Sequence, residues 1–330
     1  MLNTHKGLYR PLRLWYGVNA APAILQRFME RILNGIPGVA VLLDDIKIAS
    51  KSKIEHIKIL ELVLKILNDY NVKINLQKCE FFKDQIKYCG HIINKDGIHK
   101  DPTKMEAVKK MPKPTNVSEL KSFIGMINYY ARFIKNLSLI LEPLNALLQK
   151  NNRFIWPKQC NEAFERAKCE FARDNCMVHF DPKGTLVLAC DASLYGGAAV
   201  LSHRYKNNTE KPIIFISHSL NKKQRKYTQI DKEAFAIVFA IKRLYQYLYG
   251  NFFILITDNK PLVHIFGENK SLPVHSAMRM QHYAIFLQGF NFRIEYRKSE
   301  NHANADCMSR LPVKKTGQLD KIDAYFVIVQ

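Results

Sequence analysis

The chain has 330 residues, of which 47% are hydrophobic, which is too long for one small domain and enough for two or three. It carries 50 Lys and Arg residues against 29 Asp and Glu residues, a formal net charge of +21 that is spread along the sequence. This balance favours a polyanionic partner, nucleic acid ahead of a membrane surface, and leaves open a basic soluble protein without such a partner.

Cysteine usage and hydropathy indicate the compartment. The 7 cysteines are odd in number, scattered and without a C-x-x-C pair, which is typical of reduced packing residues. The longest apolar run, AFAIVFAI at 234–241, is far shorter than the roughly 20 residues of a membrane span. No signal-peptide pattern is present. We therefore expect an intracellular protein, cytoplasmic or nuclear, with no transmembrane segment and no membrane partner.

The first hundred residues predict short strands that alternate with helices. Apolar residues recur with a helical period in APAILQRFMERIL at 21–33. The stretch VLLDDIKIAS predicts a hairpin of two short strands with Asp44 and Asp45 at its tip. An amphipathic helix is expected over 54–74 and a single strand over 85–93.

Residues 101–150 change to a helical pattern, punctuated by MPKPTN at 111–116. Basic residues in this stretch interleave with Tyr129, Tyr130 and Phe133. Such a stretch could grip a duplex backbone or form an ordinary helical core, and the sequence favours neither.

The pattern changes again after residue 157. The expected order is a helix through Phe171, three strands over 185–219, a long helix from about 224 to 249, a strand over 252–258, a helix over 278–288, a strand over 291–299 and a short last helix. This order predicts a mixed five-stranded sheet with flanking helices, within a multidomain chain of α/β and α+β class. The final segment, VKKTGQLDKIDAYFVIVQ, shows no partner.

Four acidic residues in this half stand where a purely structural role is strained. Asp191 and Asp258 end apolar strands, Glu233 precedes the apolar run of the long helix, and Asp306 begins the short last helix. Taken singly, each has an ordinary explanation as a turn residue or a helix cap. Together they predict four converging carboxylates, which repel one another unless divalent cations bind them.

These segments resemble a known family. CDASLYGGAAVLSH, YTQIDKEAFAIVFAIKRLYQYLYG, ITDNKPL and NADCMSRLP resemble the ribonuclease H domain of gypsy-type LTR retrotransposon Pol polyproteins, and the likeness is continuous from about residue 160 to 312. The resemblance implies hydrolysis of the RNA strand of an RNA–DNA hybrid. It implies that Asp191, Glu233, Asp258 and Asp306 bind two Mg²⁺ ions, or Mn²⁺, about 3.5–4 Å apart.

His302 precedes Asp306 in the loop where ribonucleases H often place a histidine for proton transfer or product release. A surface histidine without a task is an equal alternative.

The N-terminal half resembles the reverse transcriptase palm of the same family. GLYRPLRLWYGVNAAPAILQRFM is similar to the segment that contacts template and nucleotide, with matches at Gly17, Asn19, Pro22 and Gln26. LQKCEFF and YCGHII resemble the next two segments, and the second implies a primer grip that includes Gly90 and His91. DPTKMEAVKKMPKPTNVSELKSFIGMINYYARFI is similar to the thumb and connection, and no segment resembles an integrase.

VLLDDIKIAS resembles the Tyr-x-Asp-Asp polymerase hairpin, with Leu42 in the tyrosine position. A two-metal polymerase site also needs a third carboxylate from an upstream strand. Residues 1–43 contain one acid, Glu30, which belongs to the helix after the nucleotide-contacting segment. We therefore expect Asp44 and Asp45 to bind one cation weakly and the polymerase site to be incomplete.

The expected organisation is a partial palm over 1–97, a thumb and connection over 98–155, a ribonuclease H-like domain over 156–312 and a tail over 313–330. The resemblance implies an RNA–DNA hybrid as substrate, together with upstream polymerase and downstream integrase portions of a larger polyprotein as partners. The alternative is a catalytically silent remnant that only binds nucleic acid. A fragment that fails to fold, because half a palm leaves strand edges unpaired, is also left open.

Overall fold

The computed structural model describes residues 2–10, 17–149, 154–267, 278–297 and 325–329. Packing divides the chain into two compact units, which we call unit 1 (residues 1–95 and 316–330) and unit 2 (residues 96–315). None of the helices in these described ranges combines the length and apolarity that crossing a bilayer requires.

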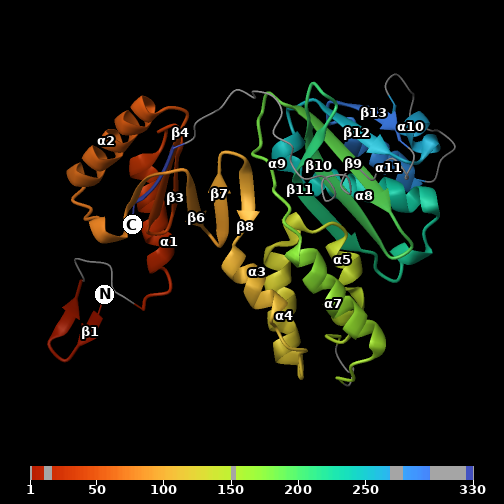
Figure 1. Cartoon of the computed structure of the whole chain (residues 1–330), viewed down its shortest axis with the longest axis horizontal. Coiled ribbons are helices and arrows are strands. Elements are labelled where there is room, and N and C mark those ends of the chain that lie inside the picture. The colour runs from red at the N-terminus through yellow and green to blue at the C-terminus, as the bar shows by residue number, and fades with distance from the viewer. Residues whose placement is uncertain (1, 11–16, 150–153, 268–277, 298–324, 330) are drawn as a thin grey trace. The chain divides into compact units, whose positions relative to one another are not determined.

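Unit 1 is built on a four-stranded sheet in the order β3-β4-β14-β5, with α1 and α2 packed beside β3 and β4 (Figure 1). The bounds are α1 (Ala21–Leu33), β3 (Val39–Leu42), β4 (Asp45–Ser50), α2 (Lys53–Asp69), β5 (Glu80–Lys83) and β14 (Tyr325–Val329). Ile46 and Ile48 on β4 are almost fully buried against Met29, Leu33 and Val63. The antiparallel β3–β4 pair confirms the predicted hairpin.

The C-terminal strand β14 differs from the expectation of an unpartnered tail. It pairs antiparallel with β4 on one side and with β5 on the other. Its sequence, YFVIV, consists of β-branched and aromatic residues that favour strands. The sequence does not reveal the partners because the paired strands lie some 240 to 280 residues earlier, and a local pattern carries no information at that range.

Residues 85–93, expected as one strand, fold as a hairpin of β6 (Gln85–Tyr88) and β7 (His91–Asn94). Cys89 and Gly90 form the turn, with φ angles of 47° and 69°. Two consecutive positive φ angles are typical of the tight turn that matches strand twist. The single-strand prediction is therefore wrong, because Cys-Gly is a weaker turn signal than Asn-Gly. A second small hairpin joins β1 (Leu2–Thr4) and β2 (Gly7–Tyr9).

Unit 2 contains the predicted mixed five-stranded sheet, in the order β11-β10-β9-β12-β13. The strands are β9 (Thr185–Ala192), β10 (Gly196–Arg204), β11 (Glu210–Ser219), β12 (Phe253–Thr257) and β13 (Phe292–Tyr296). β9, β10 and β11 are antiparallel, whereas β12 runs parallel to both β9 and β13. The parallel pairs are possible because helices supply the crossover connections.

Helices cover one face of this sheet and form part of a common core with it. α8 (Gln229–Arg243) lies across β9 and β10, as Figure 1 shows. The other helices after the third strand are α9 (Tyr245–Leu248), α10 (Lys260–Phe266) and α11 (Met278–Leu287). Leu186, Leu188 and Leu201 of the sheet pack with Ile237 of α8 in one buried cluster. The long helix expected to 249 is therefore broken after Arg243, and α10 was not expected from the sequence.

The helices before the sheet share a second core with it. They are α3 (Pro102–Lys109), α4 (Val117–Tyr129), α5 (Leu137–Ile140), α6 (Glu142–Ala146) and α7 (Lys158–Ala172), preceded by β8 (Gly97–Lys100). Phe123 of α4 and Phe164 of α7 pack in the same cluster as Phe215 of β11. Ser219 Oγ also donates to the carbonyl of Ser138 at 3.1 Å. The boundary predicted at residue 155 therefore falls inside one packed core.

The sequence left two roles open for Tyr129, Tyr130 and Phe133, contact with a duplex or packing in a helical core, and the structure separates them by burial. Tyr130 and Phe133 are 2% and 0% exposed and belong to this core, whereas Tyr129 is 54% exposed. Lys100 is also buried here: its Nζ donates to the carbonyl of Arg173 and faces the Phe133 ring at 5.6 Å. Burial lowers the pKa of Lys100 to about 8, against the opposing effect of nearby Asp174.

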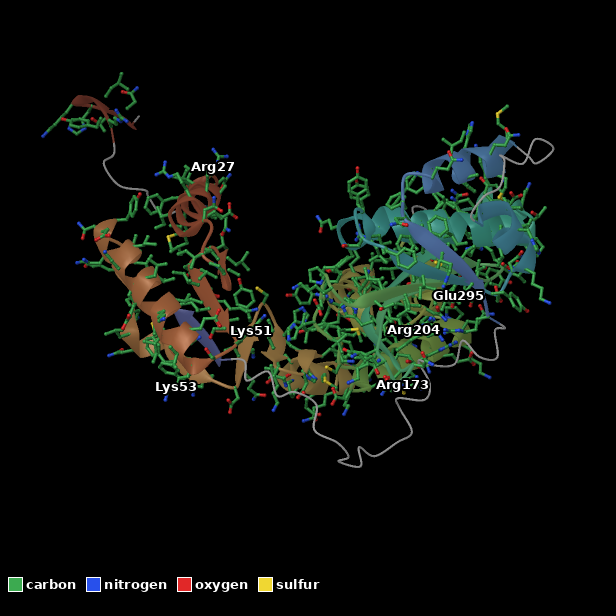
Figure 2. All side chains as sticks on the ribbon, turned by 90° about the horizontal axis from the view of Figure 1, so that it is seen from above. Arg27, Lys51, Lys53, Arg173, Arg204 and Glu295 are labelled. Carbon is green, nitrogen blue, oxygen red and sulfur yellow. The ribbon has the colours of Figure 1, made fainter. Side chains whose placement is uncertain are left out.

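An ion-pair network joins strand ends of unit 2. Glu210 accepts from Arg297 at 2.7 Å and from Arg204 at 3.0 Å. Arg204 also lies 3.6 Å from Glu295, and these two residues are labelled in Figure 2. Burial opposes ionisation of Glu210, but the two guanidinium groups outweigh it and hold the pKa of Glu210 below its usual value.

Candidate active sites

Two of the predicted carboxylates lie at one end of the unit 2 sheet. Asp191 is the penultimate residue of β9, and Asp258 directly follows β12. The strands are parallel, with Ile256 opposite Ala189, so continuing the register by two residues puts Asp258 level with Asp191. Neighbouring strands lie about 4.8 Å apart, and residues that are level share a face. The sheet therefore brings these two carboxylates together.

Helix α8 adds Glu233 to the same place. Gln229, one turn before Glu233, donates from Nε2 to the carbonyl of Ala192 and to Glu233 Oε1, both at 2.8 Å. This amide therefore ties the start of the helix to the strand end that carries Asp191. A Cβ added at Gly197 would meet the Cβ of Ala236 at 2.9 Å, so the glycine allows the helix to lie this close to the sheet.

Glu233 is in a setting that disfavours its charge. The residue is 7% exposed, and its second oxygen, Oε2, makes no hydrogen bond within the described part of the chain. Burial raises the pKa of Glu233 above its usual value, and the carboxylates of Asp258 and Asp191 raise it further, against the hydrogen bonds from Gln229 and Asn259. A bound cation would reverse this balance.

The chemistry of these donors fits a hard divalent cation. Oxygen-only ligands suit Mg²⁺ or Mn²⁺, and the buried oxygen of Glu233 is a group that a cation would satisfy. Within the described ranges, no group of three or more Asp, Glu, His or Cys side chains is arranged to hold a metal ion. The predicted fourth ligand, Asp306, and the predicted proton-transfer residue, His302, lie outside the described residues.

In unit 1, the aspartate pair lies at the β3–β4 turn. Leu42 pairs with Asp45, which leaves Leu43 and Asp44 as the turn residues. Leu43 has a φ angle of 57°, an uncommon conformation for a residue other than glycine. Asp44 is exposed and Asp45 is half-buried.

Gln26 holds this turn against α1. Its Nε2 donates to the carbonyl of Val41 at 3.1 Å, and its Oε1 accepts from the backbone N–H of Leu43. The same Nε2 donates to Glu30 Oε1 at 2.7 Å. The side-chain amide of Gln26, which was predicted to contact nucleic acid, is thus hydrogen-bonded within the protein, and so is the carboxylate of Glu30.

The other residues predicted to bind nucleic acid lie in two places. Gly17 and Asn19 are exposed in the turn before α1, and Pro22 lies in the first turn of that helix. Gly90 lies in the β6–β7 turn and His91 begins β7. This turn approaches the aspartate hairpin, because burial and then the Asp45 carboxylate raise the pKa of the Cys89 thiol beside Gly90.

Lys47 and Tyr88, which sequence reasoning missed, lie where the aspartate hairpin and the β6–β7 turn meet. Lys47 Nζ lies 5.3 Å from the centre of the Tyr88 ring, within the range of a cation–π contact. The fold therefore brings the aspartate hairpin and the predicted primer-grip turn together. Gln229 was missed in unit 2, although its position four residues before Glu233 on one helix face is a usable signal.

Two family models match the chain. Residues 1–93 match the family described as reverse transcriptase (RNA-dependent DNA polymerase). Residues 181–290 match the RNase H-like domain found in reverse transcriptase. The second match contains Asp191, Glu233 and Asp258.

Curated relatives are transposon polyproteins. The Retrovirus-related Pol polyprotein from transposon 297 of Drosophila melanogaster is 35% identical over 95% of this chain and 29% of its own length. The Transposon Tf2-3 polyprotein of Schizosaccharomyces pombe is 33% identical over 96% of this chain and 24% of its own length. The chain thus spans between a quarter and three tenths of these relatives.

Solved structures share the fold. The foamy viral protease-reverse transcriptase in complex with dsDNA has a TM-score of 0.74 at 23% identity, over 87% of this chain and 60% of that one. The foamy viral protease-reverse transcriptase in complex with an RNA/DNA hybrid has a TM-score of 0.70 at 22% identity, over 94% and 41% of the two chains.

Proposed function

This chain belongs to the reverse transcriptase and ribonuclease H family of transposon Pol polyproteins, and on that premise we propose that unit 2 hydrolyses the RNA strand of RNA–DNA hybrids. The proposed ligands of the two divalent cations are Asp191, Glu233, Asp258 and Asp306. Mg²⁺ is the expected metal, with Mn²⁺ as a substitute.

The observation that carries this proposal is the state of Glu233. A carboxylate oxygen that is buried, makes no hydrogen bond within the described chain and faces two other carboxylates is costly in a purely structural role. A cation bound at this oxygen would offset the free-energy cost. Bound there, two Mg²⁺ ions supply an activated water and stabilise the leaving oxygen of the phosphodiester.

The residues of the chain have distinct tasks in this proposal. Asp191 and Asp258, at the ends of adjacent parallel strands, supply oxygens from the rigid sheet. Gln229 orients Glu233 by donating to its Oε1, which would leave Oε2 available to a bound cation. The excess of basic residues attracts the phosphate backbones of the hybrid.

Primer extension is not proposed for this chain. Asp44 and Asp45 supply two carboxylates. Glu30, the one acid among residues 1–43, lies on α1 and accepts a hydrogen bond from Gln26. Leu42→Tyr is therefore expected not to produce extension of an RNA-templated primer. Measurable extension by the chain alone would contradict this reasoning. Upstream polymerase and downstream integrase portions are proposed partners within a larger polyprotein.

The test is degradation of a labelled RNA–DNA hybrid by the full chain in the presence of Mg²⁺. Asp191→Asn and Asp258→Asn are expected to abolish cleavage, whereas Glu162→Gln, on the exposed side of α7, is expected to leave it unchanged. Cleavage that survives Asp191→Asn would refute the assignment.

The alternative is a silent nucleic-acid-binding remnant, which the net charge of +21 also favours. This alternative predicts that the chain binds the hybrid but does not cleave it in the presence of Mg²⁺ or Mn²⁺.

A further inference from the structure

The sheet of unit 1 contains a place for one strand that only the far end of the chain fills. In the strand order β3-β4-β14-β5, β14 lies between two strands of the N-terminal region. β4 and β5 each present one backbone edge to it. If β14 were removed, the facing edges of β4 and β5 would carry unpaired N–H and C=O groups, with room for one strand between them.

The β4 side of the groove is held independently of β14, whereas β5 has no strand partner other than β14 among the described strands of this sheet. β4 is paired on its other edge with β3, and its Ile46 and Ile48 are 2% and 0% exposed in the core with α1 and α2. The acceptor edge is therefore held by a hairpin and two helices. Its occupant, by contrast, is five residues of the C-terminal region, which follow the undescribed range 298–324.

The two sides of the groove hold β14 unequally. Against β4 the register is unbroken over five pairs, from Tyr325 opposite Ser50 to Val329 opposite Ile46. Against β5 there are two pairs, separated by a shift in register. Phe82 of β5 has a φ angle of 52° at this shift, a bulge with a strained residue. The β5 side is the weaker one.

We propose that the groove between β4 and β5 is a strand-acceptor site and that β14 is its displaceable, tethered occupant. The site binds an extended apolar peptide that runs antiparallel to β4, by the main-chain pairing that joins peptides to sheet edges. Because Asp45 is the first residue of β4, the occupant also restrains the aspartate hairpin. This proposal is independent of the nuclease function proposed for unit 2.

The test uses a labelled peptide of residues 320–330, DKIDAYFVIVQ, and full-length chains. Val327→Pro removes a backbone donor in the middle of β14, where proline is not tolerated in an inner strand. The peptide is expected to bind the Val327→Pro chain at least about tenfold more tightly than the wild-type chain, whose groove is filled. Val327→Thr, which keeps the N–H group and β-branching, is the matched control and should behave as wild type.

Amide hydrogen exchange in β4 and β5 gives a second readout. Exchange is expected to be faster in the Val327→Pro chain and to return toward the wild-type rate when the peptide is added. If the substitution unfolds unit 1, recovery of its structure by the peptide supports the proposal, and failure to recover refutes it. Equal peptide affinity for wild-type and Val327→Pro chains, or equal exchange in both, also refutes it.

Discussion

Gly197→Ala tests whether close packing of α8 on the sheet positions the proposed nuclease carboxylates. The added Cβ would lie 2.9 Å from the Cβ of Ala236, whereas carbon atoms normally rest about 3.5–4.0 Å apart. Neither atom can rotate away, so the helix or the strand must shift. Overpacking of this kind costs about 1–3 kcal/mol. Since Glu233 lies one turn before Ala236, we also expect a loss of hybrid cleavage beyond that caused by unfolding.

Ala236→Gly supplies the compensating change. Alone, it places glycine in a helix interior and is expected to cost about 1 kcal/mol. Combined with Gly197→Ala, it removes the atom in collision, so the double variant should be about 1 kcal/mol less stable than wild type and should regain cleavage. The expected coupling between the two sites is therefore about 1–3 kcal/mol.

The assay is urea unfolding of the full chain followed by circular dichroism, beside hybrid cleavage under native conditions. Gly125→Ala in α4 is the matched control, because an added Cβ there meets open space and alanine favours the helix by about 0.5–1 kcal/mol. The reasoning fails if Gly197→Ala unfolds at the same urea concentration as wild type, or if Ala236→Gly does not rescue it.

Three further predictions concern the core and the charges of unit 2. Lys100→Met should stabilise unit 2 by up to about 3 kcal/mol at pH 7, because the lowered pKa of Lys100 means that a buried charge destabilises the folded state. The gain in stability, measured by urea unfolding, should shrink as pH rises from about 8 toward 10.5. Glu210→Gln should remove stability that the wild type has above pH 4.5 and loses as pH falls through the lowered folded pKa. Unfolding of Glu210→Gln and Arg297→Ala chains from pH 3 to 7 tests this, and a pH profile unchanged by Glu210→Gln would contradict it. Limited proteolysis should yield a stable fragment 96–315. An expressed fragment 158–315 should aggregate, because Phe215 and its neighbours would lose 12 of the 19 buried residues of their core.

Much of the fold follows from local patterns in the sequence. The period-two run VLLDDIKIAS and the alternation of strands and helices after residue 185 are short-range signals, and the structure confirms the hairpin and the mixed sheet. Asp191 and Asp258 were selected because a charge at the end of an apolar strand is costly, and the parallel register does bring them level. Their catalytic role stays a prediction, as do the roles of Asp306 and His302.

Contacts between distant segments did not follow from the sequence. Gln26 was assigned to nucleic acid because its motif resembles a contacting segment, yet its amide bonds to the hairpin 15 to 17 residues later. The predicted boundary at residue 155 rested on a change of pattern, and the buried residues show that Phe164 and Phe215 share a core with α4. Burial is decided by which surfaces meet, and a change of pattern does not report that.

The sequence by itself determined the kinds of element, the order of the sheet-forming segments and the residue types capable of two-metal chemistry. These depend on side-chain period and on charge, which are local properties. Only the tertiary structure decided that Gln229 bridges Ala192 and Glu233, that the β6–β7 turn approaches Asp45, and that Tyr325–Val329 completes the sheet of unit 1. Each of these is a pairing between segments far apart in the chain or on different elements, and its free energy exists only once the packed geometry brings the two backbones or side chains together.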